Sequence, residues 1–110
     1  MENRKKEVIG SRFYYVDLQD IYEYGKATFG LRLADSFFDE ILDLFDSLET
    51  QYLLHPECRH LETKTKIYRN IIFSSYLIIY RIKAQKIEVL RAFNGSRSPK
   101  EIKKARKIII

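Results

Sequence analysis

Arginine and aromatic residues are interleaved over residues 68–97, and their types and spacing suit the binding of an anion. Arginine offers a planar, permanently charged group that binds phosphate or carboxylate through paired hydrogen bonds, and aromatic rings offer faces on which bases stack. Tyrosines on a sheet are, however, often half-buried packing residues. A nucleic-acid surface and a surface for an anionic protein therefore both stay open. The residues are Arg69, Arg81, Arg91 and Arg97, interleaved with Tyr68, Tyr76, Tyr80 and Phe93.

The segment HPECRH gathers a second set of reactive side chains, His55, Cys58 and His60. All three are zinc ligands by type, but a tetrahedral structural site needs a fourth ligand, and no matching pair lies elsewhere in the sequence. No nucleophile motif adjoins the histidines, and the chain has no G-x-S-x-G, P-loop or G-x-G-x-x-G motif. We interpret the segment as a turn and predict neither a metal nor a cofactor.

The formal net charge is +5, and the charges are unevenly distributed. Residues 35–49 include six acidic side chains and no Lys or Arg, whereas residues 97–107 include six basic side chains and Glu101 as the one acid. The acidic residues recur at helical spacing, which is typical of a solvated helix face. The basic end favours an acidic partner, either nucleic acid or an acidic protein segment, although a solvated basic helix is the simple alternative.

The chain has 110 residues, the size of one ordinary domain, so we expect a single domain over 1–110. Cys58 is the only cysteine, which excludes an intrachain disulfide and is typical of a reducing compartment. No apolar run approaches the ~20 residues that span a bilayer, and the N-terminus lacks the apolar core of a secretory signal. These features predict a cytoplasmic protein that does not enter a membrane.

The stretch 66–94 predicts the centre of the fold. Its three runs rich in Ile, Val, Tyr and Phe, at 67–73, 76–82 and 86–93, are short and separated by polar breaks. Such runs predict consecutive antiparallel strands joined by hairpins. Each strand carries one arginine, and pairing in register would gather Arg69, Arg81 and Arg91 into a basic patch on the sheet.

Helices are predicted on both sides of this stretch. Ser11 is a candidate N-cap for a helix over 13–26, preceded by a weak strand over 5–10. Residues 31–48 carry an apolar stripe with a period near 3.6, so the two helices form an antiparallel hairpin that covers the sheet. The loop 50–66 follows, and Ser98-Pro99 opens a short basic C-terminal helix. The predicted fold class is α+β. The stripe consists of Ala34, Phe37, Phe38, Ile41, Leu42, Phe45 and Leu48.

This order of elements resembles the ParE/RelE superfamily of toxins from type II toxin–antitoxin modules. Five motifs carry the resemblance over nearly the whole chain. They are D-L-x-x-I-x-x-Y at Asp17, Leu18, Ile21 and Tyr24; Phe29-Gly30 followed by A-x-x-F from Ala34 to Phe37; HPECRHL from His55 to Leu61; IYRNIIFSSYLIIYRI from Ile67 to Ile82; and KIEVLRAF from Lys86 to Phe93.

The resemblance implies one of two activities. ParE-like members trap DNA gyrase on cleaved DNA without catalytic chemistry of their own, whereas RelE-like members cleave messenger RNA on the ribosome. Ribonuclease members commonly carry Arg early in the penultimate strand, where this chain has Leu77, and a His-Tyr pair after the last strand, where it has Asn94-Gly95-Ser96. The ParE-like branch is favoured. The alternatives are an endoribonuclease with Tyr76 and Arg97 as site residues, and a binding module without toxicity.

The ParE-like interpretation also implies partners. These are a cognate, ParD-like antitoxin with an acidic, partly disordered segment that folds onto the toxin, and DNA gyrase as the target, in a plasmid-stabilisation module. The ribosome and mRNA are the alternative target, and a homodimer or a heterotetramer with the antitoxin stays open. We expect antitoxin contact on the helical hairpin and the sheet margin. We expect target contact from Arg81, Arg91, Arg97, Lys100, Lys103 and Lys104.

Overall fold

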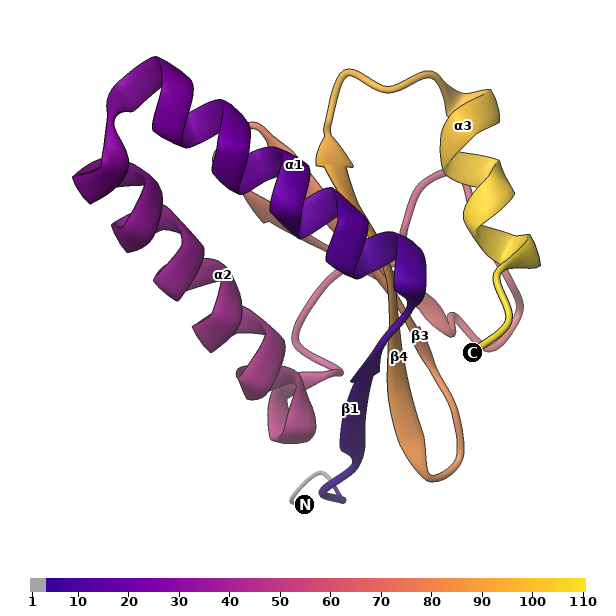
Figure 1. The fold of residues 1–110 in the computed structure, drawn as a ribbon. Helices are drawn as coiled ribbons and strands as arrows, with labels where there is room; N and C mark the ends of the chain where they lie inside the picture. Colours follow the sequence, from indigo (N-terminus) through magenta and orange to yellow (C-terminus); the bar gives the residue numbers. More distant parts are fainter. Residues whose placement is uncertain (1–3) are drawn as a thin grey trace.

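The computed structural model describes residues 4–110, which form an α+β fold. A four-stranded sheet carries a helical hairpin on one face and the C-terminal helix on the other (Figure 1). The predicted order of strand, helical hairpin, three-stranded meander and short C-terminal helix is confirmed. The elements are β1 (Glu7–Gly10), α1 (Arg12–Phe29), α2 (Leu31–Gln51), β2 (Tyr68–Phe73), β3 (Tyr76–Ile82), β4 (Lys86–Asn94), α3 (Pro99–Lys103) and the 3₁₀ turn η1 (Lys104–Lys107).

The strands lie in the order β1-β4-β3-β2 across the sheet. β2, β3 and β4 form the predicted antiparallel meander, and the two residues Ser74-Ser75 connect β2 to β3. β1 pairs in parallel with β4, so that Val8 lies opposite Ile87. The first strand of the chain is therefore held by the last one, and β1 and β2 are the two edges of the sheet.

Ser11 begins α1, as predicted. Its hydroxyl oxygen accepts a hydrogen bond from the Tyr14 N–H at 3.0 Å, which caps the helix, and the hydroxyl donates one to the Leu90 carbonyl at 2.7 Å. The capping residue thus also attaches the start of α1 to β4. This double role fixes the direction in which α1 crosses the sheet.

The connection between the helices lies at Gly30. Its φ of 92° is in the region that glycine adopts without strain, and its N–H donates to the Lys26 carbonyl at 3.1 Å. α1 ends at Phe29 rather than at the predicted Lys26, because Gly25 lies inside the helix. A Cβ atom on Gly25 would lie 3.6 Å from the Cβ of Ala34, so this glycine faces α2 at close range.

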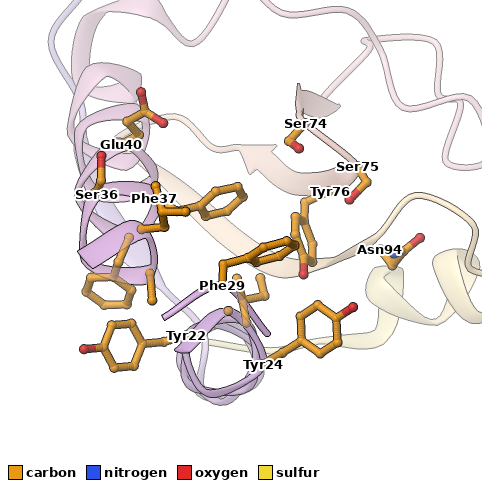
Figure 2. Close-up of a pocket in the computed structure, with 15 residues that line it drawn as sticks. Tyr22, Tyr24, Phe29, Ser36, Phe37, Glu40, Ser74, Ser75, Tyr76 and Asn94 are labelled. Carbon is orange, nitrogen blue, oxygen red and sulfur yellow. The ribbon is translucent and has the colours of Figure 1, made fainter. Parts of the chain in front are cut away.

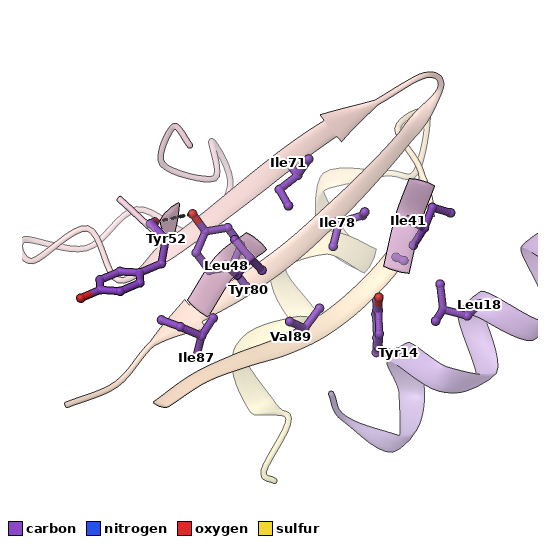
Figure 3. Packing of buried hydrophobic residues seen from close by; sticks show 11 residues of the cluster. Tyr14, Leu18, Ile41, Leu48, Tyr52, Ile71, Ile78, Tyr80, Ile87 and Val89 are labelled. Atoms are coloured by element: carbon purple, nitrogen blue, oxygen red, sulfur yellow. Dashed lines mark hydrogen bonds between the residues drawn. The ribbon is translucent and has the colours of Figure 1, made fainter. Parts of the chain in front are cut away.

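The larger part of the core lies between the helices and the sheet (Figure 3). Ile41 and Leu48 of α2 are buried there with Tyr14 of α1, as the apolar stripe predicts. Leu42 is the exception, since its side chain is exposed and the neighbouring Leu44 packs toward the core instead. The sheet contributes Ile71, Ile78, Tyr80, Ile87, Val89 and Ala92.

A second, smaller cluster lies on the opposite face of the sheet. Ile102 of α3 and Ala105 of η1 pack there against the strands. The irregular segment 52–67, close to the loop predicted over 50–66, contributes Cys58 and Leu61, both essentially fully buried. This segment is therefore part of the core. The strand residues of the cluster are Tyr68, Ile79, Leu90 and Phe93.

Candidate partner-binding surfaces

A groove of about 730 Å³ opens between the helical hairpin and the β2–β3 turn (Figure 2). The second half of α1 and the first half of α2 form one wall. The turn Ser74-Ser75, with Tyr76 and Asn94, forms the other. The groove thus lies at the hairpin and the sheet margin, the two places at which the sequence analysis expects the antitoxin.

The groove has an apolar interior. Tyr24, Phe29 and Leu33 are 60%, 63% and 60% exposed, which is unusual for three large apolar side chains at one place. Phe37 lies deeper, with its ring centroid 5.7 Å from that of Tyr76 in an edge-on contact. Clustered exposed apolar residues with a polar rim are typical of protein-binding surfaces. The rim residues are Ser36, Glu40, Ser74, Ser75 and Asn94.

The lip of the groove has a strained backbone. Ser74 has a φ of 56°, a conformation that two-residue hairpin turns need and that glycine or asparagine adopts more easily. The Gly95 N–H donates to the Ser75 carbonyl at 2.8 Å, which attaches the turn to the end of β4. The lip is therefore fixed to the neighbouring strand end at some cost in backbone energy.

Asp17 joins α1 to β4. Its carboxylate accepts hydrogen bonds from the Arg91 guanidinium at 2.7 and 2.9 Å, and one from the Ala92 N–H at 2.9 Å. The hydrogen bond to Asp17 raises the pKa of Arg91, against the opposing effect of burial. Arg91, expected in target contact, is thus half-buried and has its charge compensated inside the fold. The sequence analysis missed this role, although Asp17 is the first residue of the D-L-x-x-I-x-x-Y motif.

Arg81 is buried, although the sequence analysis expects it to contact a target. Its Nη2 lies 2.7 Å from Glu88 Oε1 and also donates to the Ile108 carbonyl at 2.8 Å. Burial acts to lower the pKa of Arg81, but hydrogen bonds with Tyr68 and Glu88 outweigh it, and the pKa is raised. The side chain attaches the C-terminal segment to the sheet, so we remove Arg81 from the candidate target surface.

The expected patch of three arginines on the sheet is not formed. Arg69 lies opposite Tyr80, whereas Arg81 lies opposite Tyr68. Because neighbouring residues of a strand point to opposite faces, the two arginines lie on different sides of the sheet. Arg69 donates to three carbonyls of the preceding loop, at 3.0, 3.1 and 3.1 Å, and Arg91 binds α1. Each arginine therefore holds a separate internal contact.

The remaining predicted target residues lie together on the segment 97–104, at and around α3. Arg97 covers Phe93, with its guanidinium carbon 5.2 Å from the ring centroid, and Arg91 covers the same ring at 5.0 Å. Lys104 Nζ lies 3.0 Å from Glu101 Oε1 on the surface. The segment presents an exposed basic surface, as predicted from its composition. Its exposed basic residues are Arg97, Lys100, Lys103 and Lys104.

Tyr76 and Arg97, the site residues of the ribonuclease alternative, do not converge. Tyr76 lies opposite Asn94 and lines the groove on the helical side of the sheet. Arg97 covers Phe93, whose side chain points to the other face because it precedes Asn94 in the strand. Burial also raises the pKa of the Tyr76 hydroxyl, which disfavours its use as a base. These two residues do not form an acid–base pair.

The HPECRH segment has a structural role. The Cys58 N–H donates to the Tyr68 carbonyl at 2.9 Å, and the His55 ring meets Tyr80 edge-on, with centroids 6.1 Å apart. Burial lowers the pKa of His55. Residues 4–110 contain no group of three or more His, Cys, Asp or Glu side chains that could hold a metal ion. Within the same residues, no helix has the length and apolarity to cross a membrane.

The fold and its surfaces define a class of protein. It is a small α+β protein whose described residues form an apolar groove and a basic C-terminal surface. Tyr76 and Arg97, the candidate catalytic residues, lie apart. Its surfaces are suited to the binding of macromolecular partners.

Comparison with known proteins identifies the family. The family model for the ParE toxin of the type II toxin–antitoxin system parDE matches residues 16–99 of this chain. The chain therefore belongs to the ParE family of toxins from type II toxin–antitoxin systems, and the resemblance seen in the sequence is confirmed. A chain of the chromosomal ParDE system of P. aeruginosa shares the fold, with a TM-score of 0.69 and 18% identity. The match covers 84% of this chain and 98% of that chain. No curated protein sequence matches significantly.

Proposed function

We propose that the chain inhibits DNA gyrase and that a cognate antitoxin neutralises it by docking in the groove. Gyrase inhibition is what membership of the ParE family implies, and both partners place the proposed activity in the cytoplasm. The exposed basic segment 97–104 supports the target half of the proposal, because a gyrase–DNA complex is a strongly anionic target. The observation that carries the antitoxin half is the apolar groove.

The groove suits an amphipathic segment of the antitoxin. Full burial of a large apolar side chain contributes about 1.5–3 kcal/mol, and Tyr24, Phe29 and Leu33 each have about 60% of that area left to bury. Covering the three contributes roughly 3–5 kcal/mol before the cost of ordering the partner is subtracted. The rim positions Ser36, Ser74 and Asn94 can then pair with polar groups at the border of the bound segment.

The target half is tested with purified gyrase, ATP, supercoiled plasmid and the purified chain. Linear DNA that appears only with gyrase, after protein is removed, supports trapping of the cleaved complex. The double variant Arg97→Glu with Lys100→Glu should lose this activity, whereas Arg59→Glu with Lys64→Glu, a matched reversal on exposed residues of the 52–67 loop, should keep it. Plasmid that stays supercoiled with the wild-type chain contradicts the proposal.

The antitoxin half is tested by co-expressing the tagged chain with the protein encoded by the adjacent gene. The double variant Phe29→Glu with Leu33→Glu should weaken the complex by at least about a hundredfold, as calorimetry on the purified pair would show. The control is Leu53→Glu with Leu54→Glu, which changes two exposed leucines outside the groove. Equal affinity of both double variants for the partner would exclude the groove as the docking site.

A further inference from the structure

One end of the sheet is incompletely covered on the face that carries α3. The register places Ile72 of β2 opposite Leu77 of β3, and Leu77 opposite Phe93 of β4, so the three side chains form one row across the sheet. We call these three residues the end row. α3, η1 and the segment 52–67 pack on this face, but Ile72 belongs to neither core cluster and is 72% exposed.

The opposite end of the row carries positive charge. The guanidinium groups of Arg91 and Arg97 both lie over the Phe93 ring, 5.0 and 5.2 Å from its centroid. Arg91 is neutralised by Asp17. Among the ion pairs of residues 4–110, none involves Arg97 or Lys100, although Glu101 lies close enough to feel the charge of Arg97. The row therefore runs from an exposed apolar side chain to an uncompensated cation.

This combination suits a protein segment better than a nucleic acid. Single-stranded nucleic acid binds by stacking its bases on exposed aromatic faces. Phe93 is only 3% exposed, and two guanidinium groups already lie over its ring. Ile72 and Leu77 offer no hydrogen-bond donor to a phosphate. An apolar side chain of a peptide, in contrast, gains by covering Ile72, and a carboxylate gains by pairing with Arg97.

We propose that the end row, together with Arg97 and Lys100, is a docking surface for an extended acidic segment of gyrase. The inference rests on the proposed function, since it takes the partner to be the target of the toxin. Two strand spacings separate Ile72 from Phe93, roughly 10 Å, and an extended chain advances about 3.3 Å per residue. The bound segment therefore carries an apolar residue and, three to four positions away, an Asp or Glu.

The experiment measures binding of the purified chain to purified gyrase by biolayer interferometry, alongside the DNA linearisation assay. The test variants are Ile72→Asp and Arg97→Glu. Their matched controls are Ile109→Asp, an isoleucine 93% exposed at the C-terminus, and Arg59→Glu, an exposed arginine of the loop. Thermal unfolding and affinity for the antitoxin, whose proposed groove lies on the other face, establish that each variant is folded.

Each test variant is expected to bind gyrase at least about tenfold more weakly, with the controls within about twofold of the wild type. Full gyrase binding by both test variants overturns this inference alone. A wild-type chain that neither binds nor traps gyrase overturns the proposed function as well. Binding of single-stranded DNA that Arg97→Glu abolishes and Ile72→Asp leaves intact would assign the surface to nucleic acid, and it would also overturn the inference.

Discussion

Replacement of Asp17 by alanine removes the contact that joins α1 to β4, and the structure allows its cost to be estimated. Two unit charges about 3 Å apart attract by roughly 5 kcal/mol at an effective dielectric constant of 20, and desolvation of both groups offsets much of this. Removing one partner of a buried pair costs about 3–5 kcal/mol. The Arg91 side chain is 23% exposed, so we expect a cost at the low end of this range, about 3 kcal/mol.

The assay is urea unfolding of Asp17→Ala, Arg91→Ala and the double variant. A loss of about 3 kcal/mol corresponds to a fall in melting temperature of roughly 12 °C for a domain of this size. The double-mutant cycle should give a coupling energy of about 1–3 kcal/mol between the two side chains. The control is Asp20→Ala, an exposed acid on the same helix, which should stay within about 0.5 kcal/mol of the wild type.

Two results would refute the reasoning. If Asp17→Ala changes the free energy of unfolding no more than Asp20→Ala does, the contact between Asp17 and β4 does not stabilise the fold. If the two single effects simply add, Asp17 acts through the Ala92 N–H and not through Arg91.

Three further predictions concern Gly10 at the end of β1, Ser74 in the β2–β3 turn and the second buried ion pair. Gly10→Ala should destabilise by about 1–3 kcal/mol in urea unfolding, because the new Cβ would lie 2.8 Å from the buried Tyr14 ring; unchanged stability would contradict this. Ser74→Gly should stabilise by about 0.5–1 kcal/mol by relieving the positive φ, and a lower urea midpoint would count against strain at the groove lip. Burial acts to raise the pKa of Glu88, but Arg81 and a neighbouring lysine outweigh it and hold the pKa below its ordinary value of 4.5. The ionised form therefore contributes stability above about pH 4.5 that is lost as the pH falls through the lowered pKa, so Glu88→Gln should lower stability at pH 7 and flatten its dependence on pH below 4.5. Urea midpoints are measured for both proteins from pH 3 to 7. If the midpoint of Glu88→Gln falls toward pH 3 as steeply as that of the wild type, this role of Glu88 is excluded.

The elements of the fold were largely predictable from local pattern. The β-branched runs at 67–73, 76–82 and 86–93 match β2, β3 and β4 to within one residue at each end. The stripe of α2 and the caps Ser11 and Ser98 were predictable for the same reason, since helix periodicity and capping depend on neighbours in the sequence. The parallel pairing of β1 with β4 was not, because no local signal specifies a partner so distant in the chain.

The fate of the arginines was the main failure of the sequence analysis. In the sequence, Arg69, Arg81 and Arg91 lie among aromatic residues just as Arg97 does. In the structure the first three bind partners inside the fold, whereas Arg97 remains at the surface. The difference lies in tertiary neighbours such as Asp17, which is 74 positions from Arg91 in the sequence. The groove was anticipated only as a general location, because no local pattern shows which apolar side chains, such as Phe29 and Leu33, stay exposed after the chain folds.

The pairing of β1 with β4 has a consequence for the synthesis of the chain. The helical hairpin can form early because its contacts are local, but the sheet closes only when β4 is present, and the contacts of Ser11 with Leu90 span 79 positions. The groove lip and the basic segment also come from the last third of the chain. A nascent chain stopped before Lys86 therefore has no partner for β1 and no basic segment, and the groove lip lacks the strand end to which Gly95 attaches it.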